Sequence, residues 1–102
     1  MAKKIKKLRP IHPGQVLKTV LEEAGISANG LALSLRIPAN RLTEIIKGRR
    51  SISADTALRL ARFFGTSAQM WMNLQARYEL DTAEDAIARQ IETEVQPMKK
   101  AS

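Results

Sequence analysis

The side chains best suited to chemistry with a ligand gather between Ala39 and Arg50. Within this segment, Leu42, Ile45 and Ile46 stand at helical spacing, which predicts one buried helical face. The other positions carry small, hydrogen-bonding or basic side chains. A helix with such an exposed face suits the major groove of DNA, where side chains of this kind read base edges. The exposed positions are Ala39, Asn40, Arg41, Thr43, Glu44 and Lys47, followed by Arg49 and Arg50.

A second short helix is predicted directly before this segment, over 28–35, with Leu31 and Leu35 on its buried face. Pro38 disfavours helical backbone in the residue before it, and it is well suited to the first turn of the next helix. A tight turn therefore separates the two helices. The pattern predicts a helix-turn-helix whose second helix, the recognition helix, spans 38–47. On spacing alone, a packed pair of helices without DNA is an equal alternative.

The helix-turn-helix needs further helices to hold it in place. One is predicted over 13–24, with His12 at its start. Because no second His, and no Cys or catalytic partner, lies near His12, we interpret it as part of the helix N-cap region and not as a ligand or proton carrier. Another is predicted over 54–64, and its core stripe is expected to be Ala57, Leu58, Ala61 and Phe64.

A fifth helix is predicted over 68–78, with large apolar side chains at helical spacing. They belong either to the core or to a seam with a second copy of the chain, since Trp and Tyr are common interface anchors. Helical spacing explains them without any cofactor. These side chains are Met70, Trp71, Leu74 and Tyr78.

An additional C-terminal helix is predicted after this, because the run Thr82–Asp85 resembles a capping box. Ile87 and Ile91 follow at a spacing of one helical turn. A single narrow apolar stripe does not hold a short helix in water. We therefore expect this helix to dock on its own domain, on a second copy or on another protein.

Charge is unevenly distributed along the 102 residues, whose net charge is +7. Residues 1–78 carry +10, whereas residues 79–102 carry −3. A basic body suits a polyanion such as DNA, and an acidic tail suits a basic partner. The alternative for both is an ordinary solvated surface. The predicted organisation is a flexible basic arm (1–9), a DNA-binding domain (10–80) and an acidic helix and tail (81–102).

Several function classes are disfavoured by what the sequence lacks. It has no Cys, a single His, no Gly-rich phosphate loop and no nucleophile with an evident base. We therefore expect a protein that is not an enzyme and has no metal, cofactor or small-molecule substrate. No apolar run is long enough for a membrane helix, and no signal-type stretch follows the basic start. A cytoplasmic protein is expected.

Three blocks of the sequence resemble the HigA/VapI-type antitoxins of the XRE (lambda-repressor-like) helix-turn-helix class. They are P-I-H-P-G-Q-V-L at 10–17, R-L-T-E-I-I-K-G-R-R at 41–50, and the run 52–62 with its continuation to 75. The resemblance covers about 9–80 and implies an all-α, five-helix domain with an additional C-terminal helix. The departures from the family pattern are Ala28 in place of Gln, Arg36 in place of the turn Gly, and Pro38 in place of a Ser-type cap.

The resemblance also implies partners. Such proteins form homodimers, repress their own operon at a palindromic operator, and inactivate a small basic toxin of HigB/RelE type that cleaves mRNA. Asn40 is suited to an adenine edge and Arg41 to a guanine edge, while Glu44 suits either cytosine or the orientation of an arginine. The main alternative is a stand-alone XRE regulator without a toxin partner.

Roles follow from the family pattern for the DNA-facing residues. Bases are assigned to Ala39, Asn40, Arg41, Thr43 and Glu44, and phosphates to Ser27, Lys47, Arg49 and Arg50. A dimer seam is assigned to Met70, Trp71, Leu74, Tyr78, Ile87 and Ile91. Toxin contacts are inferred from charge alone for Asp81, Glu84, Asp85, Glu92 and Glu94.

Overall fold

The computed structural model describes residues 9–99, which form five α-helices and, within that range, no strand. The all-α class is therefore confirmed. Most of the predicted basic arm, residues 1–8, lies outside the described residues. The helices are α1 (Pro13–Ala24), α2 (Ala28–Leu35), α3 (Ala39–Ile46), α4 (Ala54–Phe64) and α5 (Ala68–Glu94).

Serine side chains start three of these helices. Ser27, Ser53 and Ser67 each accept a hydrogen bond from the backbone N–H three residues later, at 2.9, 3.3 and 3.0 Å. Each cap satisfies a first-turn N–H that has no partner inside its helix. The turn after α2 has Arg36 in the left-handed region, at φ 61°, which costs a non-glycine residue about 1 kcal/mol.

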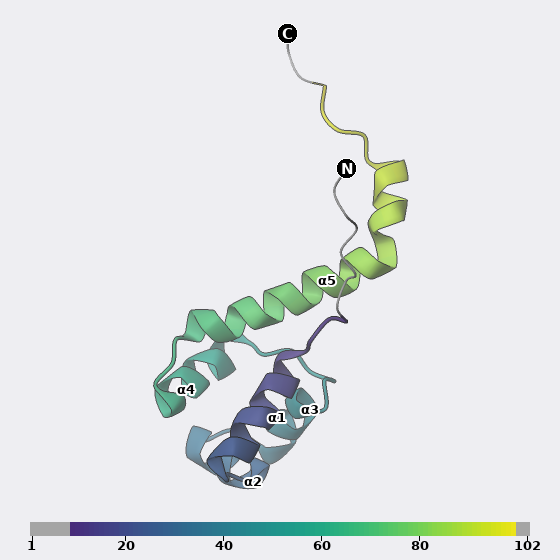
Figure 1. The fold of residues 1–102 in the computed structure, drawn as a ribbon. Helices are drawn as coiled ribbons and strands as arrows, with labels where there is room; N and C mark the ends of the chain where they lie inside the picture. Colours follow the sequence, from purple (N-terminus) through teal and green to yellow (C-terminus); the bar gives the residue numbers. More distant parts are fainter. Residues whose placement is uncertain (1–8, 100–102) are drawn as a thin grey trace.

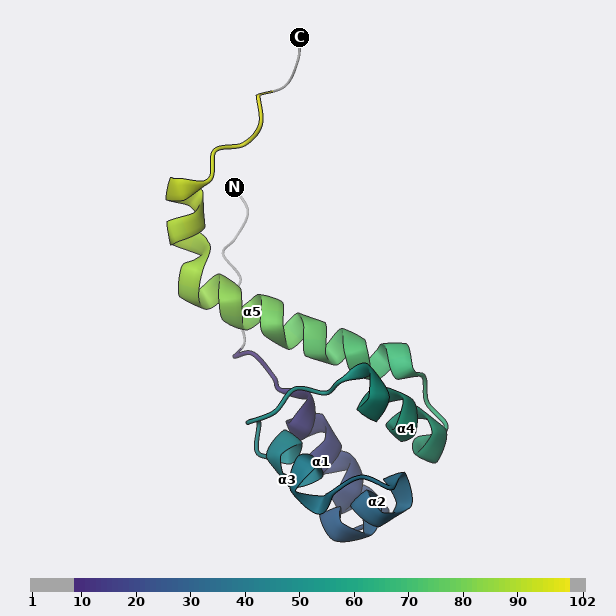
Figure 2. The same cartoon turned by 180° about the vertical axis from the view of Figure 1, so that it is seen from behind.

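One hydrophobic core lies among α1–α4 and the N-terminal part of α5 (Figure 1). Its fully buried side chains include Leu17 of α1, Leu31 of α2, Leu42 of α3 and Trp71 of α5. Figure 2 shows α5 lying across α1 and α4, and its C-terminal part extending beyond the other helices. We call α1–α4 and the packed N-terminal part of α5 the body. The C-terminal part of α5 lies outside it.

The predicted core stripe of α4 is wrong at one position. Leu58 is 63% exposed, whereas Leu60 is completely buried. The covered apolar side chains of α4 follow the helical spacing of three and four residues, at Ala57, Leu60 and Phe64. Leu58 does not fit this spacing, so its side chain faces away from the core. An exposed leucine remains on the surface of α4 as a result.

The predicted break between a fifth and a sixth helix is also wrong. α5 is helical throughout from Ala68 to Glu94, although Figures 1 and 2 show that it bends sharply in its C-terminal part. The run Thr82–Asp85 lies inside it and does not begin a helix, because no Gly or Pro between 68 and 94 interrupts the helical backbone. Although α5 is long, no helix in the part of the chain that the structure describes is apolar enough to cross a membrane.

Candidate nucleic-acid interface

The exposed face of α3 is centred on Asn40, Glu44 and Lys47. Successive residues of a helix are rotated by about 100°, and these three lie opposite the fully buried Leu42 and Ile45. Asn40 and Lys47 are exposed and Glu44 is half-buried. The face therefore presents an amide, a carboxylate and an ammonium group along one line of the helix.

Two further predicted base contacts lie beside this line. Ala39 is exposed at the start of α3. The Thr43 hydroxyl donates a hydrogen bond of 2.9 Å to the Ala39 carbonyl, so its methyl group and oxygen remain for outside contacts. Small side chains at these positions let the backbone of α3 come close to a groove floor.

Arg41 lies on the flank of α3, toward α4. Its Nη1 is 3.4 Å from Oδ1 of Asp55, and its side chain is 31% exposed. The same carboxylate accepts a 2.7 Å hydrogen bond from Nε of Arg59. That bond, together with the positive charges of the two arginines, holds the pKa of Asp55 below its ordinary value. Arg41 is thus anchored away from the centre of the exposed face.

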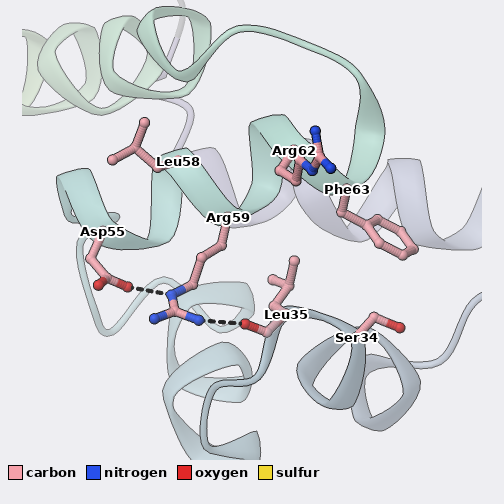
Figure 3. Close-up of a pocket in the computed structure, with 7 residues that line it drawn as sticks. All are labelled: Ser34, Leu35, Asp55, Leu58, Arg59, Arg62 and Phe63. Carbon is pink, nitrogen blue, oxygen red and sulfur yellow. Dashed lines mark hydrogen bonds and ion pairs between the residues drawn. The ribbon is translucent and has the colours of Figure 1, made fainter.

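Arg59 connects α4 to the turn that precedes α3. In Figure 3 its guanidinium bridges Asp55 and the carbonyl of Leu35, the last residue of α2. The bond to that carbonyl is 2.8 Å and satisfies a C-terminal acceptor of α2. An open cavity of about 460 Å³ lies here, lined by Ser34, Leu35, Asp55, Leu58, Arg59, Arg62 and Phe63.

The segment after α3 presents two exposed arginines. Gly48, at φ 78°, donates its N–H to the Ile45 carbonyl at 3.0 Å, and the Arg49 N–H bonds the Glu44 carbonyl at 2.8 Å. Gly48 thereby closes α3 in the left-handed conformation. Nη1 of Arg49 lies 3.6 Å from a carboxylate oxygen of Glu44, and Arg50 is exposed beside it.

A small notch follows Arg50 at the N-terminus of α4, with a volume of about 280 Å³. Guanidinium and hydroxyl groups in its wall suit the oxygens of a DNA phosphate. The wall also contains the Asp55 carboxylate, whose negative charge opposes an anion and is paired with Arg41 and Arg59. Sequence reasoning missed its three hydroxyls; the cap at Ser53 was the signal that could have pointed to them. The lining residues are Arg41, Arg50, Ser51, Ser53, Asp55 and Thr56.

Ser27 stands at the opposite end of the helix-turn-helix, at the start of α2. Its oxygen accepts the Gly30 N–H, and a hydroxyl that accepts in this way can still donate its own hydrogen. This leaves the group suited to a phosphate oxygen, as the family pattern implies.

Gln75 of α5 fixes the segment after α3 through hydrogen bonds from its side chain. Gln75 is only 4% exposed. Its Oε1 accepts the Ile52 N–H at 2.8 Å, and its Nε2 donates to Oγ of Ser51 at 3.2 Å. It also donates to the Glu79 carboxylate at 3.0 Å. Spacing did not reveal this role, because the loop partners are more than twenty residues away in sequence.

His12 is the N-cap of α1, as expected. Its Nδ1 accepts the Gly14 N–H at 2.9 Å, which places the ring proton on the other nitrogen. Burial lowers the pKa of His12, and the neighbouring backbone of Arg50 opposes this shift with a smaller effect. The ring also meets Tyr78 of α5 edge-on, with centroids 4.8 Å apart.

The predicted dimer residues fall into two groups. Trp71 is 1% exposed, and its indole N–H donates to Thr66 at 3.1 Å. It therefore belongs to the core, which corrects its assignment to a seam. Leu74 and Tyr78 are half-buried against the body. The remaining three, Met70, Ile87 and Ile91, are exposed.

The predicted toxin contacts all lie on the part of α5 that extends beyond the body. Asp81 is half-buried and bonded to Nε of Arg77 at 3.2 Å. Glu94 is exposed and accepts a hydrogen bond of 3.0 Å from Gln90. The other three, Glu84, Asp85 and Glu92, are exposed.

Comparison with known proteins places these features in context. Residues 17–71 match the family model described as helix-turn-helix. Virulence-associated protein I of Dichelobacter nodosus is 48% identical over 75 residues, which is 72% of this chain and 69% of that protein.

Two solved structures of bacterial proteins are similar over most of the chain. One is the Pseudomonas aeruginosa antitoxin HigA with the higBA promoter, with a TM-score of 0.86 and 49% identity over 89% of this chain and 100% of that one. The other is an addiction module antidote protein of the HigA family from Coxiella burnetii, with a TM-score of 0.84 and 50% identity over the same shares.

Proposed function

Because the chain belongs to the XRE-type helix-turn-helix family, in the group of HigA/VapI-type antitoxins, we propose that it binds an operator and represses its own operon. The observation that carries this proposal is the exposed line of α3, flanked by two arginines on a structured turn. A relative solved with promoter DNA, almost half identical over most of the chain, supports it.

The proposed DNA contacts divide by chemistry. Asn40 pairs with an adenine edge in the major groove, and Lys47, Arg49 and Arg50 contact phosphates. Ser27 and the notch at the start of α4 contact the backbone on either side. Arg41 reaches a guanine only by leaving Asp55, so we assign it a smaller share of base discrimination than Asn40.

The proposed partner surface is the exposed part of α5. Leu80, Ile87 and Ile91 stand seven and four residues apart, which places them on one face of the helix. We assign this stripe to a second copy of the chain, as a palindromic operator requires two reading heads.

The acidic face of the same segment is assigned to a small basic toxin of HigB type, which the chain neutralises by binding. Attraction between an acidic helix and a basic protein speeds and orients their encounter. In this role the chain has no catalytic chemistry of its own and acts in the cytoplasm.

The test combines affinity purification from the host with DNA binding. A stoichiometric small basic partner, together with selective binding to the DNA upstream of its own gene, is the expected result. The reversal Glu92→Lys with Glu94→Lys should weaken partner capture and leave DNA selectivity intact. Recovery of only a second copy and DNA would favour the stand-alone regulator.

A further inference from the structure

We infer that His12 and Gln75 are positioning residues for the segment 48–53, which we call the arginine loop. The loop carries Arg49 and Arg50, and the inference rests on their proposed contact with phosphates. Neither His12 nor Gln75 is exposed enough to meet DNA itself. Both would act through the backbone of the loop.

Gln75 holds the C-terminal side of the arginine loop. Its side-chain oxygen accepts the N–H of Ile52, and its amide nitrogen donates to Ser51. Ile52 is 1% exposed, so its N–H needs a partner inside the protein. A buried N–H without one costs far more than an average hydrogen bond contributes. The glutamine thereby fixes the backbone immediately after Arg50.

His12 holds the other side of the loop. Its Nδ1 caps α1 through Gly14, and its ring lines one cavity together with Lys47 and Gly48 at the start of the loop. The ring also lies against Gly48: a Cβ at that glycine would be 3.8 Å from Cγ of His12. One side chain therefore joins the start of α1 to the loop.

The start of α1 is itself fixed against the end of α3. A Cβ on Gly14 would overlap the Ile45 carbonyl oxygen and stand 3.0 Å from Cα of Ile46. Only a residue without a side chain allows the two backbones to approach this closely. Because the same carbonyl accepts the Gly48 N–H, α1, α3 and the loop meet at one point.

Two such anchors matter for binding because an unanchored loop must be ordered when DNA arrives. Ordering the backbone of a loop costs conformational entropy, and a loop already held in its bound shape avoids that loss. Removing an anchor should therefore weaken DNA binding through the arginines and reduce the number of phosphates that they bind.

The experiment measures binding of the full chain to two duplexes of equal length, the DNA upstream of its own gene and a scrambled sequence. Titrations run from low to physiological salt, at temperatures where thermal unfolding shows every variant folded. The variants are Gln75→Met, which removes the hydrogen bonds at similar length, and His12→Asn, which can still cap α1 and lacks the ring that lies against Gly48. Gln69→Met is the matched control on the exposed side of α5.

We expect Gln75→Met and His12→Asn to weaken binding to both duplexes about tenfold, the change that corresponds to a typical coupling between contacting residues. The slope of log affinity against log salt should fall by about 1 for each phosphate that the variant no longer neutralises. Gln69→Met should change neither the affinity nor the slope.

The deciding measurement repeats both substitutions in an Arg49→Ala, Arg50→Ala background. If the two residues act through the loop, their effect on affinity disappears there. Equal losses in both backgrounds, or a lower melting temperature with unchanged affinity and salt slope, would overturn the inference. If removing the two arginines itself leaves DNA binding unchanged, the proposed phosphate contacts fail instead. Should Gln75→Met not fold, His12→Asn decides alone.

Discussion

The two halves of α5 differ in their surroundings: the first is packed against the other helices, and the second is exposed. The first half places Trp71 and Gln75 in the interior, and the buried amide supports the loop after α3. In the second half no residue is fully buried, although Ile87 and Ile91 are apolar. The same helix is thus part of a packed body at one end and an open surface at the other.

The second half remains helical through local interactions. Arg77 with Asp81, and Gln90 with Glu94, bond at a spacing of four residues, and each such pair contributes a few tenths of a kcal/mol. Ala83, Ala86 and Ala88 have high helix propensity. Duplex DNA is rigid, so the side chains that read it must stand on a helix whose opposite face is buried. A helix stabilised only by local interactions can instead gain its packing contacts from a protein partner.

The largest expected effect tests the packed region. Gly14→Ala places a methyl group on the Ile45 carbonyl and should lower the free energy of unfolding by about 3 kcal/mol, at the upper end for overpacking. Thermal or urea unfolding measures it. Gly25→Ala is the control: it meets no atom within 4 Å and should cost only the strain of a positive φ, about 1–2 kcal/mol. Equal losses in both would mean that the α1–α3 approach is not close.

A smaller effect is expected at the reading face. Asn40→Ala should cost about 1–3 kcal/mol at the preferred DNA sequence and relax base preference at one position. Competition binding with single-base variants of the upstream DNA measures it. Arg50→Ala should instead weaken selective and scrambled DNA alike and lower the salt slope by about 1. A sequence-selective loss for Arg50→Ala would show that it reads a base.

Protonation of His12 should destabilise the body, because a protonated ring can no longer accept the Gly14 N–H. Burial lowers its pKa from 6.5, so the unfolded chain binds the proton more readily. Stability is then complete above pH 6.5 and falls as the pH drops from there to the lowered pKa of the folded protein.

Unfolding measured at several pH values, for wild type and His12→Asn, tests this dependence. His12→Asn should lack the part of the loss of stability that occurs between pH 6.5 and the lowered pKa of His12. Lys18 and Glu22 of α1, Lys47, Arg50 and Tyr78 also surround the ring or its cavity, and they are unchanged in the comparison. An identical pH profile in both proteins would exclude His12 as its source.

The smallest effect on stability is expected in the second half of α5. Removal of 81–102 should change the free energy of unfolding of the body by no more than about 0.5 kcal/mol, as for surface changes generally. It should nevertheless abolish capture of the basic partner and weaken self-association, measured by light scattering. A loss of body stability comparable to that of Gly14→Ala would erase the contrast between the two halves.

Sequence alone predicted the helix-turn-helix, because the signals are local, but the recognition helix is one residue shorter at each end than the predicted 38–47: Pro38 is its extended N-cap and Lys47 its C-cap. Ser27 caps α2, Pro38 separates α2 from α3, and Gly48 closes α3, each through atoms within a few residues. The exposed line of α3 followed from the same period of apolar residues. The positive φ of Arg36 was foreseeable for the same reason, since a turn of this length requires it.

What the sequence did not decide depends on distant partners. The period of α4 fits either Leu58 or Leu60, and only the packing of α4 against α2 and α5 decides that Leu60 is the buried one. The Thr82–Asp85 run has the pattern of a helix start, but its neighbours on both sides are helical and no breaker intervenes. A capping pattern acts only where the preceding backbone is not already helical.

The sequence by itself determined the first four helices and the start of the fifth, the basic main part and the acidic C-terminal part of the chain, and the side chains offered to a ligand, because propensity, periodicity and charge act over a few residues. Only the tertiary structure decided that Arg41 turns to Asp55, that Trp71 is interior, and that Gln75 and His12 meet the arginine loop. Such contacts join residues from separate helices, and their geometry is set by how those helices pack.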